Sequence, residues 1–253
     1  RGRNARHVHF VDDLDALRKI PVGIDPEFEK YLGQPLCDIP APNGSGGSYA
    51  DYFLNDLLNA ASLLRLEMEV VRSHQKYQTG FFRPAVETAL EHIDEVRRIL
   101  ETISGHKLGE EWSPIQVNEE GYLKKRRFVS IDKSRRTVTY EDKDGKQQSI
   151  SYAKGDVKLD WRIDWPARRW LLKVDVEPFG RDHATKGGSY DTGAALMASV
   201  FKSPPPLPIP YAFINRSGET KKMSKSAGDT VALSQLLQVL PPEVVWYFVI
   251  RCA

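Results

Sequence analysis

Short strand-like runs alternate with helical stretches over the first 105 residues of this chain. Residues 7–11 and 68–71 are compact runs rich in apolar and β-branched side chains, which is typical of strands. Residues 49–65, which follow Ser48 as a cap, and residues 84–103 instead repeat apolar side chains at helical spacing. Strands that alternate with helices predict an α/β fold in which a parallel sheet is covered by helices.

The pattern changes between residues 106 and 160, where apolar and polar side chains alternate with a period of two. Three runs there predict antiparallel strands, and Asp144-Gly145 between two of them is a strong hairpin-turn signal. The runs are residues 128–132, 137–141 and 149–152. We therefore expect a small antiparallel β subdomain at 106–160, inserted between a first part of the main domain at 1–105 and a second part at 161–253.

Cysteine is scarce, and the inserted segment has none. Cys37 and Cys252 are far apart and form no Cys-x-x-Cys pair, so the sequence predicts neither a disulfide framework nor a zinc site of thiolates. The composition, with 41% hydrophobic and 28% charged residues, is typical of a soluble globular protein. No apolar run approaches the ~20 residues that span a bilayer, and we expect a cytoplasmic protein without a membrane segment.

A basic loop is predicted towards the end of the sequence. Residues 222–226 read KMSKS, between a predicted short buried strand at 208–214 and a helix-like segment at 231–239. Two ammonium groups on flexible stems, with hydroxyl and amide donors beside them, suit a loop that closes over a triphosphate. A solvated basic loop before a helix is the alternative interpretation.

Two further stretches combine residues that suit a binding site. Residues 161–170 read WRIDWPARRW, a mixture of aromatic and charged side chains that suggests a cleft with apolar walls and polar anchors. Residues 174–193 then predict a strand, a glycine turn and a helix, the arrangement of a nucleotide-binding crevice. At the turn, Gly180 lets the backbone approach an adenosine, Asp182 can accept hydrogen bonds from ribose hydroxyls, and His183 lies one residue further into the pocket. A helix cap for Asp182 and a hydrogen-bonded structural role for His183 are the alternatives.

In this order, WRIDWPARRW, Gly-x-Asp-His and KMSKS resemble the class I lysyl-tRNA synthetases, and the resemblance extends over nearly the whole chain. The string WRIDWPARRW argues against another class I synthetase, such as the glutamyl type. The resemblance implies a Rossmann-type catalytic core that activates lysine with ATP to give lysyl-adenylate and then transfers lysine to tRNA(Lys). No HIGH-type motif occurs in the sequence, so we expect a fragment that lacks this motif and the anticodon-binding domain. A non-catalytic, synthetase-like module that binds nucleotide or RNA is the alternative function.

The resemblance also implies roles for individual residues. Lys222 and Lys225 are the candidate catalytic residues, because they would stabilise charge on the leaving pyrophosphate. Trp161 and His183 would contact the lysine substrate, the tryptophan through a cation–π contact with an ammonium group. The candidate ATP-binding residues are Gly180, Asp182, Met223 and Ser224. Mg²⁺ would accompany ATP, and zinc is not expected, although family members often carry cysteine pairs in the inserted segment.

The carboxylate that faces the substrate ammonium stays open, and the candidates are Glu177, Asp164, Asp12 and Asp13. A net charge of +2 is too small to indicate nucleic-acid binding by itself. For the basic residues 124–127, a solvated strand edge protected by lysines is favoured over a contact with the tRNA acceptor arm. We expect the protein to act as a monomer.

Overall fold

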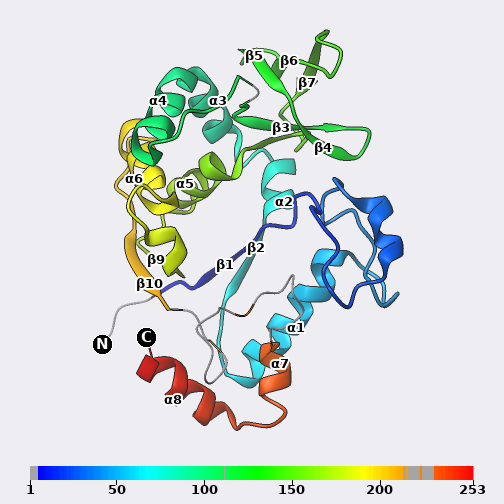
Figure 1. The fold of residues 1–253 in the computed structure, drawn as a ribbon, viewed down its shortest axis with the longest axis vertical. Helices are drawn as coiled ribbons and strands as arrows, with labels where there is room; N and C mark the ends of the chain where they lie inside the picture. Colours follow the sequence, from blue (N-terminus) through cyan, green and yellow to red (C-terminus); the bar gives the residue numbers. More distant parts are fainter. Residues whose placement is uncertain (1–4, 111, 213–214, 216–222, 224–230, 253) are drawn as a thin grey trace. The chain divides into compact units, whose positions relative to one another are not determined.

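The computed structural model describes residues 5–110, 112–212, 215, 223 and 231–252 (Figure 1). The chain separates into two compact units. The first unit consists of Arg1–His74 and Ala212–Ala253, and the second unit of Gln75–Tyr211. Within the described residues, no helix is both long enough and apolar enough to cross a membrane.

A parallel strand pair and the helix that connects its strands form the centre of the first unit. β1 (Val8–Val11) pairs with β2 (Glu69–Arg72), and α1 (Tyr49–Leu63) lies between them in the chain. Ser48 caps α1 through a capping box, since its hydroxyl accepts from the Asp51 N–H and the Asp51 carboxylate accepts from the Ser48 N–H. The strands and the helix predicted for this part of the chain are confirmed.

Shorter elements complete the first unit. A 3₁₀ helix, η1 (Pro26–Tyr31), packs beside the buried side chains of Leu17, Ile39 and Tyr49. The predicted helix-like segment at 231–239 is reduced to the single turn α7 (Leu233–Leu236), which packs on α1, and the chain continues into α8 (Pro242–Cys252).

The second unit is built on helices that pack against one another. After α2 (Ser73–Gln78), the helices α3 (Arg83–Glu91), α4 (Ile93–Ser104), α5 (Trp161–Leu172) and α6 (Ser189–Ser199) follow, and α6 packs on both α4 and α5.

The single helix predicted at 84–103 is wrong, because the backbone leaves the helical region at His92, with φ −109° and ψ 29°. The His92 ring and N–H both lie against the Thr88 carbonyl, so this carbonyl at the end of α3 has hydrogen-bond partners. A new helix, α4, then begins at Ile93. The apolar stripe continues across this break and therefore does not reveal it.

Two antiparallel sheets occupy the segment with period-two patterning. β5 (Arg127–Asp132), β6 (Thr137–Glu141) and β7 (Gln147–Ser151) form one sheet in that order, which confirms the three predicted strands. The second sheet has the order β4-β3-β8, and its strands were not predicted from the sequence. They are β3 (Ile115–Glu119), β4 (Tyr122–Lys125) and β8 (Val157–Leu159).

A second parallel pair follows α5. β9 (Val176–Gly180) pairs with β10 (Leu207–Tyr211), and a short 3₁₀ turn, η2 (Arg181–Ala184), leaves the carboxyl end of β9. The predicted buried strand at 208–214 is wrong in its burial, because every residue of β10 is exposed. The strand carries two prolines, which lack an N–H and are typical of edge strands.

The described residues thus form a mixed α/β structure with two parallel pairs and two antiparallel three-stranded sheets. A continuous Rossmann-type sheet, and the domain division at residues 105 and 160, stay predictions.

Candidate active site

Helix α5 carries the string WRIDWPARRW and lies beside β9. Its first residue is Trp161, and Asp160 caps it by accepting a hydrogen bond from the Arg162 N–H at 3.3 Å. Trp161 and Trp165 are four residues apart and so share one face of the helix. Trp161 is half-buried and Trp165 is buried. This aromatic face of α5 is therefore partly open to solvent at Trp161 and covered by protein at Trp165.

His183 packs on this face of α5. Its ring lies edge-on to the Trp165 indole, with the centroids 5.2 Å apart, and its Nδ1 is 3.3 Å from the Ser189 hydroxyl at the start of α6. His183 therefore packs on Trp165, the residue one helical turn after Trp161. His183 itself lies on η2, which leaves the carboxyl end of β9, the edge at which open α/β folds bind ligands.

Gly180 and Asp182 lie at the same edge. Gly180 is the last residue of β9, and Asp182 is exposed on η2. The Gly180 backbone has φ −61° and ψ 140°, which any residue can adopt. Its dihedral angles therefore do not require glycine, and the close approach of a ligand would be the reason for it.

Gly187, in the loop between η2 and α6, does require glycine. Its φ is +73°, and an added Cβ would lie 2.5 Å from the Ile103 carbonyl oxygen. The loop that follows His183 is thus pressed against the end of α4.

Five side chains form an interior group next to His183: Trp165, Arg169, Glu177, Phe179 and Tyr190. The Arg169 guanidinium carbon lies 3.9 Å from the Trp165 ring centroid and 5.4 Å from that of Tyr190, and Phe179 stacks on Tyr190. Glu177 accepts from Trp165 Nε1 at 2.6 Å through Oε1 and from Arg169 Nε at 2.7 Å through Oε2. Burial lowers the pKa of Arg169 from its ordinary value, and the charge of Glu177 opposes this shift.

These contacts bear on which carboxylate can face the ammonium group of the substrate. Each carboxylate oxygen of Glu177 already accepts a hydrogen bond from this interior group. Asp164 is almost completely buried and accepts from the Tyr77 hydroxyl at 2.6 Å, with Lys158 Nζ 3.6 Å away. Burial and the charge of Asp164 together raise the pKa of Tyr77 well above its ordinary value, so the phenol stays a donor. Two of the four candidate carboxylates are therefore occupied by protein groups.

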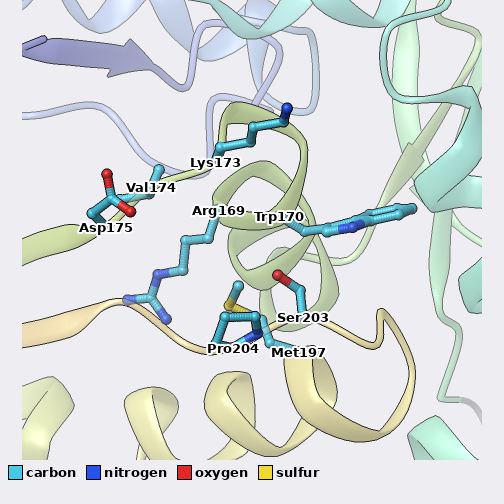
Figure 2. Close-up of a pocket in the computed structure, with 8 residues that line it drawn as sticks. All are labelled: Arg169, Trp170, Lys173, Val174, Asp175, Met197, Ser203 and Pro204. Carbon is cyan, nitrogen blue, oxygen red and sulfur yellow. The ribbon is translucent and has the colours of Figure 1, made fainter.

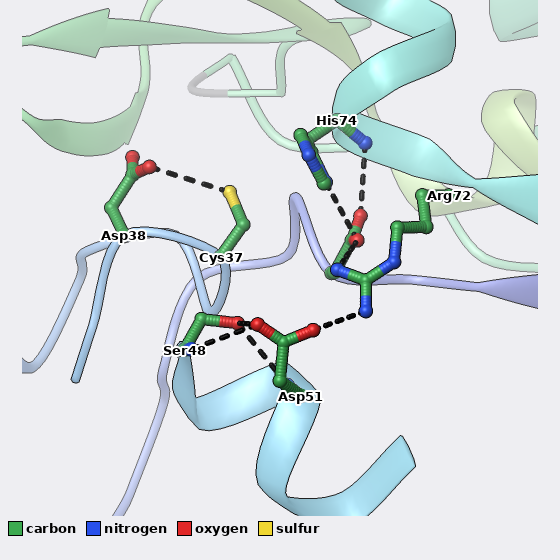
Figure 3. Close-up of polar contacts among 7 residues, drawn as sticks. Cys37, Asp38, Ser48, Asp51, Arg72 and His74 are labelled. Carbon is green, nitrogen blue, oxygen red and sulfur yellow. Dashed lines mark hydrogen bonds and ion pairs between the residues drawn. The ribbon is translucent and has the colours of Figure 1, made fainter. Parts of the chain in front are cut away.

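A third candidate, Asp13, is occupied in the first unit. This fully buried carboxylate accepts from the His74 N–H at 2.9 Å, lies 2.6 Å from His74 Nδ1 and is 3.6 Å from Arg72 Nη1. Figure 3 shows the polar contacts continuing from Arg72 to Asp51 and on to Ser48. Asp13 therefore caps the first turn of α2 and joins β1 to β2. Asp12, next to it, is half-buried.

A hollow of about 250 Å³ lies at the other end of β9 (Figure 2). Its lining includes the cation Lys173 and the carboxylate Asp175 just before the strand. Figure 2 shows that Arg169 and Trp170 leave α5 in different directions, and Trp170 stacks on Phe201 with the centroids 5.1 Å apart. Because the hollow opens near the amino end of β9, opposite the end that carries His183, we do not assign the substrate to it.

The KMSKS run is mostly outside the described residues. Lys222, Ser224 and Lys225 all lie outside them, and Met223 is described as half-buried. Their roles stay predictions. Among the described residues, no group of three or more His, Cys, Asp or Glu side chains is arranged to hold a metal ion.

Comparison with known proteins decides the family. The family model described as tRNA synthetases class I (K) matches residues 1–253, that is, the whole chain. The chain belongs to this family. Proteins similar to the chain include lysine–tRNA ligase 1 of Methanosarcina acetivorans, which is 39% identical over 99% of the chain and 47% of its own length. The lysine–tRNA ligase of Methanosarcina barkeri is 38% identical over 99% and 47%, and that of Archaeoglobus fulgidus is 37% identical over 99% and 50%.

The chain spans about half the length of these members of the family. The resemblance to class I lysyl-tRNA synthetases noted in the sequence is therefore confirmed at the level of the family. The sequence had pointed to Trp161 and His183 and to residues 161–170 as a cleft, but it did not show that Trp165 and Arg169 meet at Glu177. The spacing of Trp165 and Arg169, four residues apart, was a signal that they share a helix face.

Proposed function

We propose that the protein containing this chain activates lysine with ATP and transfers it to tRNA(Lys). Membership of the family over the whole chain carries the proposal, and the names of the relatives, lysine–tRNA ligases, support lysine as the amino acid. The aromatic face of α5 next to His183, at the carboxyl end of β9, supports an amino-acid site there. A Rossmann-type sheet completed by the rest of the protein, with the division at 105 and 160, belongs to the same proposal.

In the first step, a lysine carboxylate oxygen attacks the α-phosphorus of ATP. The bond between the α-phosphorus and the bridging oxygen breaks, and pyrophosphate leaves with the bonding electrons. Lys222 and Lys225 would stabilise the charge that develops on pyrophosphate, with Met223 and Ser224 of the same loop beside the nucleotide. Because lysine itself supplies the nucleophile, positioning and electrostatic stabilisation are the contributions of the protein.

The remaining candidate residues bind and orient the substrates. Gly180 and Asp182 would contact the adenosine, and Trp161 would place its ring over an ammonium group of lysine beside His183. Mg²⁺ would enter with ATP as a companion of its phosphates. In the second step, a terminal ribose hydroxyl of tRNA(Lys) attacks the activated carbonyl carbon, and AMP leaves.

The deciding experiment is ATP–pyrophosphate exchange by the full-length protein, with lysine tested against the other amino acids. Lys222→Ala and Lys225→Ala should each reduce lysine-dependent exchange at least tenfold, as expected for lost transition-state donors. Lys221→Ala removes the same charge one residue before the motif and is the matched control. A folded protein that binds ATP or RNA but exchanges with no amino acid would instead be a binding module.

A further inference from the structure

Three of the four residues in the basic run at 124–127 have carboxylate partners. Arg126 makes two hydrogen bonds to Glu119, of 2.6 and 2.8 Å, and Arg127 pairs with Glu141 at 2.6 Å. Lys125 pairs with Asp160 at 2.8 Å. Guanidinium and ammonium groups that are held by carboxylates in this way are less available to phosphate, which favours a role within the protein over RNA binding.

The Lys125 contact differs from the other two in where its partner lies. Glu119 and Glu141 belong to strands of the antiparallel sheets, whereas Asp160 is the N-cap of α5. The Asp160 side chain is 5% exposed and that of Lys125 is 59% exposed, so an ammonium group reaches in from the surface to a buried cap. The carbonyl of Asp160 also accepts from the N–H groups of Ile163 and Asp164, both at 2.8 Å.

A second ion pair holds the same turn of the helix. Lys158 on β8 lies 3.6 Å from Asp164, and both side chains are 1% exposed. The Tyr77 hydroxyl joins this pair, because it donates to Asp164 at 2.6 Å and accepts from the Leu159 N–H at 3.2 Å. Buried charges of this kind depend on their partners, since removing one partner leaves the other unpaired in a medium of low polarity.

Both lysines come from one sheet. β4, which carries Lys125, and β8, which carries Lys158, are the two outer strands of the sheet β4-β3-β8. Trp161, the first residue of α5, lies between Asp160 and Asp164 in the sequence and is the residue that the proposed function needs. The sheet β4-β3-β8 therefore holds Asp160 and Asp164 through two ion pairs. Asp160 precedes the candidate lysine-binding residue Trp161 in the sequence, and Asp164 follows it.

We propose that Lys125 and Lys158 are positioning residues that act through Asp160 and Asp164 to fix Trp161 for the amino-acid substrate. The sheet β4-β3-β8 then serves amino-acid recognition through two ion pairs. The negative charge of Asp160 is favourable at the positive end of the helix dipole, and its ion pair with Lys125 fixes the orientation of the Asp160 side chain. The proposal rests on the proposed function, because lysine binding at Trp161 is part of that function.

Lys125 offers the sharper test because its side chain is largely exposed and its loss leaves no cavity. Lys125→Met in the full-length protein should raise the KM for lysine in ATP–pyrophosphate exchange roughly two- to fivefold, the range expected for a partly exposed pair. The KM for ATP should stay unchanged. Lys125→Arg should restore most of the loss, and Lys143→Met, in the exposed turn between β6 and β7, is the control for removal of one positive charge.

A double variant separates positioning from a general effect. Asp160→Asn keeps the cap but removes its charge, so adding Lys125→Met to it should have little further effect on the KM for lysine. The exchange assay contains no tRNA, so any effect in it cannot come from a lost RNA contact.

Each outcome bears on one of the two proposals. If the wild-type protein shows no lysine-dependent exchange, the proposed function fails. If the wild type exchanges normally and Lys125→Met changes only the KM for tRNA in aminoacylation, Lys125 is an RNA contact and the positioning role is overturned. A lower melting temperature with an unchanged KM for lysine would overturn it as well, because the ion pair would then be only structural.

Discussion

Trp165 and Arg169 stand one turn apart on α5 and are joined by a third residue, because the indole N–H and the guanidinium Nε donate to the two oxygens of Glu177. The guanidinium also lies over the indole ring, 3.9 Å from its centroid. His183 packs on the same indole, so the position of a candidate substrate residue depends on this interior group. Stability and substrate binding should therefore respond together to changes in it.

Glu177→Gln should lower the free energy of unfolding by about 3 kcal/mol, because Arg169 would be left buried without its charged partner. The amide can still accept from Trp165, so the loss reports mainly on the ion pair. Urea unfolding followed by tryptophan fluorescence measures it, with the exposed Glu110→Gln as the control. A loss below about 0.5 kcal/mol would mean that the pair does not stabilise the unit.

Tyr77→Phe should cost about 2 kcal/mol in the free energy of unfolding, since a buried acceptor on Asp164 and the Leu159 N–H both lose their partner. Tyr52→Phe makes the same change at an exposed position on α1 and should stay within about 0.5 kcal/mol of the wild type. Equal effects of the two variants in urea unfolding would contradict the assigned hydrogen bonds.

Gly187→Ala should be far more destabilising than Gly145→Ala. Both glycines have a φ near +75°, at +73° and +76°, so both variants bear the cost of about 1 kcal/mol for a left-handed alanine. Only at Gly187 would the new Cβ meet a backbone carbonyl, at 2.5 Å, whereas nothing lies within 4 Å at Gly145. The difference between their melting temperatures measures the clash, and no difference would show that the loop can move away from α4.

Cys37 should react slowly with iodoacetamide. Burial, followed by the charges of Asp38 and Asp13, raises the pKa of its thiol from 9.0 to about 12, so at pH 8 the thiolate is scarce. In a Cys252→Ser variant, alkylation at pH 8 should be roughly 100-fold slower than that of a free cysteine. Urea-unfolded protein is the control and should react at the ordinary rate.

The same shift predicts a pH dependence of stability. The folded pKa lies above the unfolded value, so the contribution is complete below pH 9 and is lost as the pH rises towards 12. Unfolding midpoints of the wild type should therefore fall more steeply above pH 9 than those of Cys37→Ala. Parallel curves would contradict the shift.

Local patterns predicted those parts of the fold that depend on local sequence. Ser48 and the stripe that follows it predicted α1, and the alternation around Asp144-Gly145 predicted β6 and β7. The strands β4 and β8 were missed because they are only four and three residues long, and β3 was missed although it alternates, because one of its partners, β8, lies beyond β4 to β7 in the chain. The break at His92 was missed for a different reason, since one non-helical residue hardly disturbs the spacing of apolar side chains.

The candidate site shows the same division. The resemblance to class I lysyl-tRNA synthetases selected Trp161, His183, Gly180 and Asp182. The structure places Gly180, Asp182 and His183 at the carboxyl end of β9, and Trp161 at the start of α5. The sequence could not tell which carboxylates were already engaged. Asp164 and Glu177 are held by Lys158, Tyr77, Arg169 and Trp165, and these contacts exist only once β8, β9 and α2 pack on α5.

The two prolines of β10 have a consequence for the behaviour of the protein in solution. The Leu207 N–H donates to Asp175, so the odd-numbered residues of β10 direct their amides towards β9. Pro208 and Pro210 therefore occupy the positions whose amides would point away from β9. That outer edge lacks two successive donors, and a strand from another molecule could not complete a ladder along it. An exposed strand of this kind would otherwise invite aggregation, and here the covalent structure of the chain itself discourages it.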